Sequence, residues 1–348
     1  METKDFLIEE KLTVIDAMKR LDETAKGVLY VVRDNRLAAA ISDGDIRRHI
    51  ISNGNLKAPV REVANYSPIF LYENDADRAQ ELMQEKQVRS IPIVGEEGEV
   101  LRIVFADRDE AETVSRALQG IPVVIMAGGF GTRLYPYTKI LPKPLIPIGD
   151  IPIAELIMNE FHRFGAEEFY LIVNYKKNMI KAYFTETQLP YKVHFVDEDK
   201  PLGTGGGLSL LKGKIQGTFL LSNCDILVKD DFGKMLDLHR GQRNLITMVV
   251  SAKNFTLPYG IVDLDDDGRI REMREKPSLS FLTNTGVYLA ESRVIDELEE
   301  DRAIGFPEMI DGYRKAGERT GIYPVSEDSW YDMGQFEEMK RMEEALEK

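Results

Sequence analysis

The sequence contains little of what several classes of protein require. Its single cysteine, Cys224, excludes an internal disulfide and does not suggest a zinc cage. No apolar run approaches the roughly 20 residues that a membrane helix needs, and the charged N-terminus contains no apolar signal segment. The formal net charge of −14 argues against a broad nucleic-acid surface, which requires a basic face. We therefore expect a cytoplasmic protein that binds neither nucleic acid nor a membrane.

What is present is an ordinary globular composition in a chain long enough for two domains. The 348 residues are 43% hydrophobic and 30% charged, which argues against disorder. We predict a smaller α+β domain at residues 1–118 and a second domain at 119–348, joined by a short connector at 113–121. In the second domain apolar strands alternate with helical patterns, which predicts an α/β fold with a mostly parallel sheet.

Two stretches near the N-terminus are alike, from Thr13 to Ile50 and from Asp75 to Glu112. Each predicts an amphipathic helix, an apolar strand, a polar turn, a second strand and an acidic helix start. A unit of about sixty residues that occurs only twice is unsuited to a solenoid and suits two repeats packed as one module.

These stretches resemble a tandem CBS pair, a regulatory module that often binds adenine nucleotides. Ser42-Asp43-Gly44-Asp45 is similar to the family's Ser/Thr-x-x-Asp pattern, which implies that Ser42 and Asp45 hold AMP, ADP or ATP at a helix start. Alternatively, the same two residues only cap a helix. The second repeat has Ala106-Asp107-Arg108-Asp109, where the hydroxyl is missing. Because CBS pairs often dimerise, a homo-oligomer is expected.

A glycine-rich turn follows the first strand of the second domain, at Ala127–Leu134. Glycines there let the backbone approach a ligand and expose amides to phosphate oxygens, and Arg133 adds a cationic fork that suits phosphate. Leu134 occupies the position where a dinucleotide fingerprint needs its third glycine, and no G-x-x-x-x-G-K-[ST] string occurs. The turn is therefore neither of these two phosphate loops.

Lys143 follows in Leu141–Ile148, where flanking prolines stiffen its backbone. The string MAGGFGTRLYPYTKILPKPLIPIGDIPIAELI closely resembles the opening signature of nucleoside-diphosphate-sugar pyrophosphorylases. This resemblance implies a Rossmann-like, glycosyltransferase-A-like domain with a mixed, mostly parallel sheet, in which Arg133 and Lys143 act on the nucleotide phosphates as catalytic residues. It also implies a set of nucleotide-binding positions: Gly128, Gly129, Gly131, Thr132, Glu198, Gly203 and Thr204.

The reaction of that family joins two anions and uses a divalent cation, here Mg²⁺, which prefers carboxylates, phosphate oxygens and water. Asp225 follows an apolar strand at its carboxyl end, where open α/β sheets place their sites. Asp332 lies in a W-x-D-x-G string. Both resemble metal-binding aspartates of the family, although Asn223-Cys224-Asp225 has cysteine where the family usually has glycine.

Two further segments resemble the family's sugar-binding motifs. Glu275-Lys276-Pro277 is similar to an E-K-P motif that meets sugar hydroxyls and the sugar phosphate. Thr285-Gly286 is similar to a segment that lines the sugar pocket, and Pro201–Leu208 resembles the family's second nucleotide loop, with a hinge as the alternative.

The resemblance implies a sugar-1-phosphate nucleotidylyltransferase, which makes an NDP-sugar and pyrophosphate from a nucleoside triphosphate and a hexose or amino-sugar 1-phosphate. Glu198 lies near the position from which some relatives read the base, and a carboxylate there accepts hydrogen bonds from guanine. GTP is therefore favoured, and UTP or CTP remain open. A competing hypothesis is a CBS nucleotide sensor with a non-catalytic transferase domain.

Overall fold

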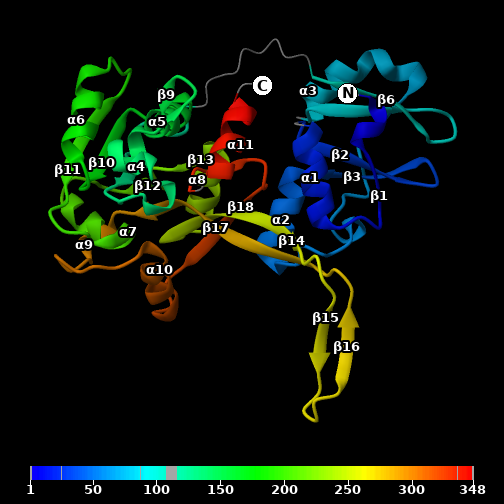
Figure 1. Ribbon diagram of the computed structural model, residues 1–348. Coiled ribbons are helices and arrows are strands. Elements are labelled where there is room, and N and C mark those ends of the chain that lie inside the picture. Colours follow the sequence, from blue (N-terminus) through cyan, green and yellow to red (C-terminus); the bar gives the residue numbers. More distant parts are fainter. Residues whose placement is uncertain (1, 25, 87, 107–115, 335, 347–348) are drawn as a thin grey trace. The chain divides into compact units, whose positions relative to one another are not determined.

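The computed structural model describes residues 2–24, 26–86, 88–106, 116–334 and 336–346 (Figure 1). These residues divide into two compact units, which we describe separately. The first unit comprises Met1–Ala111, Ser251–Thr283 and Ser326–Asp328, and the second comprises Glu112–Val250, Asn284–Val325 and Ser329–Lys348. The domain boundary at residue 118 stays a prediction. The Asp107–Asp109 part of the second repeat lies outside the described residues.

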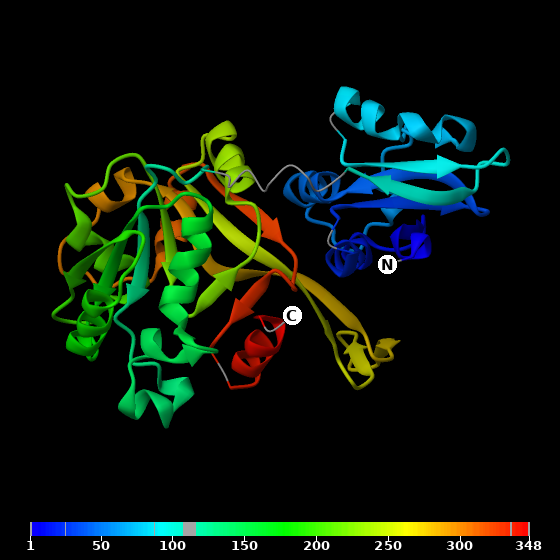
Figure 2. The ribbon, with the colours of Figure 1, turned by 90° about the horizontal axis from the view of Figure 1, so that it is seen from above.

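The two N-terminal repeats have the same topology, as the sequence predicts. In each three-stranded sheet the first two strands are parallel and the last two are antiparallel, in the orders β1-β2-β3 and β4-β5-β6. The first repeat contains β1 (Leu7–Glu9), α1 (Val14–Thr24), β2 (Val28–Arg33), β3 (Arg36–Ser42) and α2 (Asp43–Asn53). The second contains β4 (Leu71–Tyr72), α3 (Ala79–Lys86), β5 (Ser90–Val94) and β6 (Val100–Phe105). Figure 2 shows their blue and cyan strands side by side.

Local sequence explains these elements. Asp34 and Asn35 form the β2–β3 turn with φ values of 51° and 62°, a conformation that these residue types tolerate in tight hairpins. The apolar face of α1 is buried because Val14, Met18 and Leu21 recur at helical spacing. The repeats meet at a buried 2.8 Å hydrogen bond between the Tyr30 hydroxyl and Ser90 Oγ.

A seven-stranded mixed sheet forms the centre of the second unit, in the order β11-β10-β7-β12-β17-β14-β18. Strands β11, β10, β7 and β12 are parallel, and β17 pairs antiparallel with β12. The strands are β7 (Val123–Ala127), β10 (Glu168–Val173), β11 (Lys192–Asp197), β12 (Thr218–Asn223), β14 (Ile246–Thr256), β17 (Ser278–Glu291) and β18 (Thr320–Val325). The predicted Rossmann-like α/β fold with a mixed sheet is confirmed.

The sheet carries an apolar cluster on each face. Along β7, Val123 and Ile125 belong to one cluster and Val124 to the other, because alternate side chains of a strand point to opposite faces. The first cluster includes side chains of α5 (Ile153–Arg163), α6 (Lys177–Glu186), α8 (Phe232–Gly241) and α11 (Phe336–Leu346). The second includes side chains of α9 (Arg293–Asp296) and α10 (Phe306–Lys315). Covering both faces explains why β7 is apolar along almost its whole length.

Short elements connect the larger ones. They are η1 (Thr3–Phe6), η2 (Val60–Glu62), η3 (Glu73–Arg78), η4 (Thr132–Leu134), α4 (Tyr137–Ile140), η5 (Lys143–Leu145), β8 (Pro147–Ile148), β9 (Ile151–Pro152), α7 (Gly203–Gly206), η6 (Gly207–Leu211), β13 (Ile226–Val228) and β19 (Trp330–Asp332). Between β14 and β17 the chain forms a hairpin of β15 (Ile261–Leu264) and β16 (Ile270–Arg274), yellow in Figure 1. Within the described part of the chain, no helix has the length and apolar character needed to cross a membrane.

Candidate active site

The first glycine loop brings two predicted site residues close to its backbone. A Cβ at Gly128 would lie 2.8 Å from Glu198 Oε2, and a Cβ at Gly131 would lie 3.1 Å from the Cβ of Lys143. Gly131 also has a φ of +63°, which side chains rarely tolerate. No atom lies within 4 Å of the Cβ position of Gly129, so this side of the loop is open. Glycine at 128 and 131 is therefore required for the loop to contact Glu198 and Lys143.

Lys143 and Asp225 form a buried ion pair. Lys143 lies in η5, and Asp225 lies between the end of β12 and the start of β13. The Lys143 Nζ donates a hydrogen bond to Asp225 Oδ2. The two side chains are only 11% and 10% exposed. Because removal of either partner would leave an unpaired buried charge, the pair fixes the position of both groups.

Asp332 lies beside Asp225 although the two are far apart in the sequence. Strands β13 and β19 pair antiparallel with Ile226 opposite Asp332, and the Met333 amide donates to the Asp225 carbonyl at 2.9 Å. Burial and, next, the Asp225 carboxylate raise the pKa of Asp332. Its Oδ1 atom is buried and has no hydrogen-bond partner among the described residues. The charges of Lys143 and Arg133 oppose this rise in pKa, but neither side chain donates a hydrogen bond to Oδ1.

Arg133 completes the cluster. A Cβ at Gly334 would lie 2.8 Å from Asp332 Oδ1 and 3.1 Å from Arg133 Nη1, so this glycine leaves room for both groups. Arg133 is exposed, in contrast to Lys143. The four residues Arg133, Lys143, Asp225 and Asp332 thus lie in one region of the second unit, and two cationic and two acidic groups meet there.

The two carboxylates fit a divalent cation that takes its other ligands from phosphate and water. No group of three or more His, Cys, Asp or Glu side chains suited to a metal occurs in the residues described. Mg²⁺ is commonly held by one or two carboxylates plus substrate phosphates, so a pair is sufficient. The buried, unpartnered Oδ1 of Asp332 is the atom that a cation would satisfy.

Glu198 lies between the two glycine loops and is buried rather than facing water. Its Oε1 accepts the Leu202 amide at 3.0 Å and would lie 3.1 Å from a Cβ at Gly207. Burial raises the pKa of Glu198. The Asn174 side chain donates to the Glu198 carbonyl at 2.6 Å. Asn174 was missed in the sequence, although it follows β10 at its carboxyl end, where Asp225 also lies relative to β12.

The second glycine loop packs its first residues against another part of the chain. A Cβ at Gly203 would lie 2.7 Å from the Ile304 carbonyl, and Gly205 and Gly206 donate their amides to that same carbonyl. The Thr204 hydroxyl accepts the Phe306 amide at 3.0 Å. The close approach of the backbone to Ile304 thus explains the glycines at these positions. Contact of Gly203, Thr204 and the exposed Thr132 with a nucleotide stays a prediction.

The predicted sugar-binding residues fall in both units. In the second, Thr285 is buried, and its hydroxyl donates to the Val249 carbonyl at 2.8 Å. Gly286, with φ +89°, leaves room for the Asn223 side chain, which would lie 2.5 Å from a Cβ there. Glu275 and Lys276 are exposed and belong to the first unit, where they follow β16. Their contact with a sugar phosphate stays a prediction.

Ser42 and Asp45 form a helix cap in the first unit. The Ser42 amide and hydroxyl donate to Asp45 Oδ2 at 2.9 and 2.6 Å, and the Asp45 amide donates back to Ser42 Oγ at 3.2 Å. Arg48 donates to the other carboxylate oxygen of Asp45. This capping box satisfies the start of α2 and is the alternative that the sequence left open.

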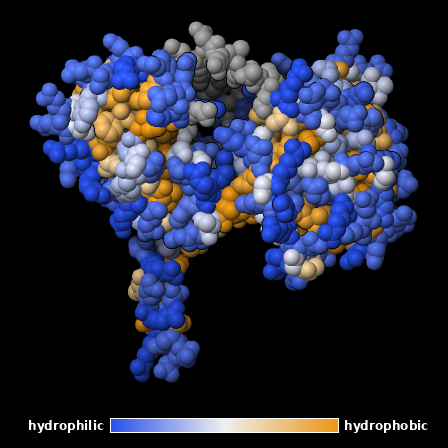
Figure 3. All heavy atoms as spheres, turned by 180° about the vertical axis from the view of Figure 1, so that it is seen from behind, coloured by the Kyte–Doolittle hydropathy of each residue, from blue (hydrophilic) through white to orange (hydrophobic). Residues whose placement is uncertain are grey.

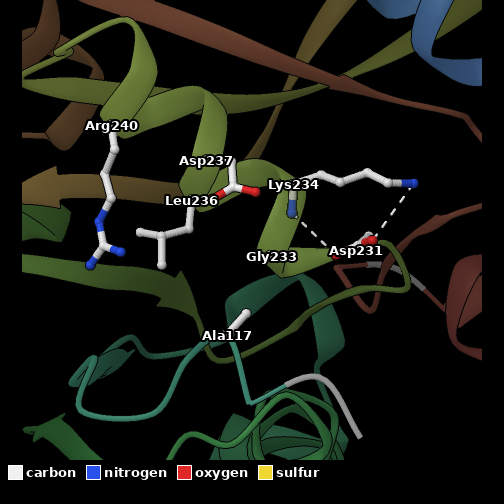
Figure 4. A pocket seen from close by; sticks show the side chains of 7 residues that line it. All are labelled: Ala117, Asp231, Gly233, Lys234, Leu236, Asp237 and Arg240. Atoms are coloured by element: carbon white, nitrogen blue, oxygen red, sulfur yellow. Dashed lines mark hydrogen bonds and ion pairs between the residues drawn. The ribbon is translucent and has the colours of Figure 1, made fainter. Parts of the chain in front are cut away.

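A separate surface cavity of about 370 Å³ lies at the start of α8 (Figure 4). It is lined by Ala117, Asp231, Gly233, Lys234, Leu236, Asp237 and Arg240. None of these is a predicted site residue. Asp231 Oδ1 caps the helix by accepting the Lys234 amide at 3.1 Å, and the Lys234 amine lies 3.6 Å from Asp231 Oδ2. Asp231 and Lys234 therefore interact with each other at the helix start.

Two curated proteins are similar to a large part of this chain. The bifunctional protein GlmU of Methanococcus aeolicus is 34% identical over 218 residues, which cover 61% of this chain and 51% of the relative. A mannose-1-phosphate guanylyltransferase of Mycobacterium tuberculosis is 30% identical over 231 residues, 65% of this chain and 64% of the relative. The chain thus spans about half to two thirds of the length of these relatives.

The fold also matches solved structures. The crystal structure of HddC from Yersinia pseudotuberculosis complexed with GMP-PN has a TM-score of 0.52 and 24% identity, and the match covers 65% of this chain and 99% of HddC. The nucleotidyl transferase family matches residues 122–348, which include the glycine loop, the Lys143–Asp225 pair and Asp332. With well over half of its length matched, this chain belongs to the nucleotidyl transferase family.

Proposed function

We propose that the chain is a sugar-1-phosphate nucleotidylyltransferase, which joins a nucleoside triphosphate to a sugar 1-phosphate and releases pyrophosphate. The observation that carries this proposal is the cluster of Arg133, Lys143, Asp225 and Asp332 around one glycine loop. Two mutually repelling phosphate groups can approach each other only where positive charge is concentrated. Membership of the nucleotidyl transferase family supports the same reaction class.

In the proposed reaction an oxygen of the sugar 1-phosphate attacks the α-phosphorus of the triphosphate. A new P–O bond forms as the bond from the α-phosphorus to the bridging oxygen breaks, and pyrophosphate leaves with that electron pair. Such transfers depend mainly on positioning and charge stabilisation. In this proposal Lys143, which is paired with Asp225, would contact the α-phosphate, and the exposed Arg133 would contact the transferring and leaving phosphates.

Asp225 and Asp332 would hold Mg²⁺ when it is bound. The ion would supply positive charge to the phosphate oxygens of the substrate. The arrangement of the two side chains suits this role. The Asp332 Oδ1 atom is buried and has no hydrogen-bond partner among the residues that the structure describes, and the neighbouring Asp225 carboxylate disfavours ionisation of Asp332.

We further propose that Glu198 selects GTP. An ionised carboxylate can accept hydrogen bonds from both the N1–H and the exocyclic amine of guanine, whereas cytosine and uracil do not offer this pair of donors. Glu198 lies beside Gly128 and Gly207, so the base would be held between the two glycine loops. The guanylyltransferase activity named for the mycobacterial relative supports this choice.

On the acceptor side, Glu275 and Lys276 would bind the sugar hydroxyls and the sugar phosphate, and Thr285 and Gly286 would line the sugar pocket. The substrate class is a hexose or amino-sugar 1-phosphate. Lys276 has a positive φ of 42°, so the E-K-P turn holds a conformation that is uncommon for a side-chain-bearing residue.

For the N-terminal repeats we propose a CBS pair that binds an adenine nucleotide at Ser42 and Asp45 and changes the turnover of a cytoplasmic, homo-oligomeric enzyme. The shared topology of the two repeats supports this proposal. Equal rates with and without AMP or ATP would count against it.

The test is a pyrophosphate-release screen of the purified chain with Mg²⁺, four nucleoside triphosphates and a panel of sugar 1-phosphates. We expect turnover with GTP and one hexose or amino-sugar 1-phosphate. Turnover with UTP or CTP instead would reject the role of Glu198 but retain the reaction class. Absence of turnover with every pair, while adenine nucleotide still binds, would favour a sensor with a non-catalytic transferase domain.

A further inference from the structure

Exposed apolar side chains are concentrated in one short part of the chain. Of the 17 exposed large hydrophobic residues among those described, eight lie between residues 255 and 281, which we call the hairpin arm. They are Phe255, Tyr259, Val262, Leu264, Ile270, Met273, Leu279 and Phe281. Scattered apolar residues are normal on a protein surface, whereas such a concentration marks an interaction surface.

The register of the hairpin places four of these side chains on one face. Val262 lies opposite Met273, and Leu264 lies opposite Ile270. Val262 and Leu264 are two residues apart on one strand, so they point to the same side of the hairpin, and Met273 lies opposite Val262 on that side. The register shifts between Asp263 and Leu264, and this irregularity skips Arg271 and brings Ile270 opposite Leu264. These four side chains are 46%, 66%, 56% and 63% exposed, in the order Val262, Met273, Leu264 and Ile270.

The other face of the hairpin is charged and internally paired. Arg274 donates to Asp263 at 2.7 Å, and its Nε lies 3.7 Å from Glu272. In Figure 3 the hairpin is the lowest segment, and most of the surface seen there is hydrophilic. The hairpin is therefore amphipathic, with an apolar face of four side chains and a face of ion pairs.

The distribution of charge along the hairpin indicates what covers the apolar face. The turn contains Asp265, Asp266 and Asp267 with Arg269 after them and is net acidic, whereas Arg271 lies along β16 and Arg274 is paired on the other face. Two copies related by a two-fold axis, with the hairpins antiparallel, would bring the acidic turn of each toward Arg271 of the other. A two-stranded hairpin is marginally stable in water without a packing partner.

We propose that the apolar face of this hairpin, formed by Val262, Leu264, Ile270 and Met273, is a contact between two copies of this chain in a homodimer. An isologous contact of this kind buries both apolar faces at once, because each hairpin offers the other the same surface. The proposal does not depend on the reaction that the chain catalyses.

The test measures the mass of the full chain in solution by size-exclusion chromatography with light scattering, over a range of concentrations. The test variant combines Val262→Lys with Met273→Glu, which makes the face polar and keeps an attractive pair across the hairpin. The matched control combines Asp263→Asn with Glu272→Gln on the other face. Circular dichroism and thermal unfolding establish that each variant is folded. If the test variant fails to fold, Val262→Ser with Met273→Ser replaces it.

We expect the wild type and the control to have the same mass, equal to two chains or a multiple of two, and the folded test variant to have half that mass. A wild type that is monomeric at every concentration would overturn the proposal, whatever other protein it binds. A folded test variant that retains the wild-type mass would overturn it as well.

Discussion

Two polar pairs that the sequence predicts as ligand sites differ in how the structure satisfies their hydrogen bonds. Ser42 and Asp45 in the first unit bond to each other and to the start of α2, so their hydrogen-bonding capacity is largely used within the chain. In the second unit Asp225 and Asp332 lie side by side, yet Asp332 Oδ1 remains buried without a partner in the described residues. An unsatisfied buried oxygen costs free energy unless a ligand reaches it. This difference favours the second pair as the ligand site.

The largest expected effect on turnover comes from replacing Lys143. Lys143→Ala should lower turnover by about 10²–10³-fold, because a fixed positive charge at the reacting phosphate is removed. Arg133→Ala should fall in the same range. Lys139→Ala is the matched control, since Lys139 is exposed in α4, four residues before Lys143. Pyrophosphate release measures all three, and undiminished turnover in Lys143→Ala would remove this lysine from the mechanism.

Glu198→Gln should change the choice of base. Replacing a charged acceptor removes about 1.5–3 kcal/mol of hydrogen bonding, so kcat/KM for GTP should fall about 10–100-fold. Asp199→Asn is the control, because the Asp199 side chain is 94% exposed.

The same residue predicts a pH dependence. Burial raises the pKa of Glu198, so its ionised form is lost as the pH falls through that raised value. The KM for GTP should therefore rise toward acidic pH, and Glu198→Gln should abolish this component of the profile. A profile that is identical in the wild type and the variant would contradict the role of Glu198.

Asp225 and Asp332 can be distinguished by how their replacement changes the stability of the fold. The pKa of Asp332 is raised above its ordinary value of 3.8, so the folded chain binds more protons than the unfolded chain between these two values. Its ionisation therefore lowers stability as the pH rises through that window, and this cost persists at neutral pH. Without divalent cation, Asp332→Asn should raise Tm by about 2–4 °C for each kcal/mol regained.

The corresponding change at Asp225 should have the opposite effect on Tm. Asp225→Asn leaves Lys143 buried without its carboxylate, so its Tm should fall. Both variants should lose the increase in Tm that Mg²⁺ gives the wild type. Differential scanning calorimetry with and without Mg²⁺ measures these effects, and a Mg²⁺ response retained by both would reject the metal site.

The smallest expected effect concerns the first unit. Ser42→Ala should cost about 1 kcal/mol through the lost helix cap, and it should weaken the binding of AMP or ATP measured by calorimetry. Ser52→Ala is the control, because Ser52 lies at the other end of α2 and is exposed. Unchanged affinity in Ser42→Ala would make the pair a helix cap alone.

The sequence was most informative where one residue must meet two constraints. Gly131 needs both a positive φ and space beside Lys143, and Asp225 follows closely after a buried strand, so both stand out in a single chain. The likeness of the two N-terminal stretches likewise predicted two similar units, each with a helix and two strands, although the first strand of each sheet was not predicted.

Contacts between distant segments were less accessible. The glycines at 203 and 205 fit a nucleotide loop by pattern, but the adjacent space is occupied by Ile304, which no local pattern indicates. The hydroxyl of Thr285 likewise bonds to the Val249 carbonyl of a neighbouring strand. These contacts depend on which segments become neighbours in the fold, and the residues of a single motif do not specify that.

The pairing of β13 with β19 has a consequence for how the chain acquires activity during synthesis. Every strand of the seven-stranded sheet is complete by Val325, but Asp332 reaches Asp225 only when β19 adds to β13. In the proposed mechanism, the first glycine loop and the Lys143–Asp225 pair could thus form before the chain can hold a metal ion through both aspartates. Activity would then depend on the pairing of a three-residue strand that comes after every strand of the main sheet.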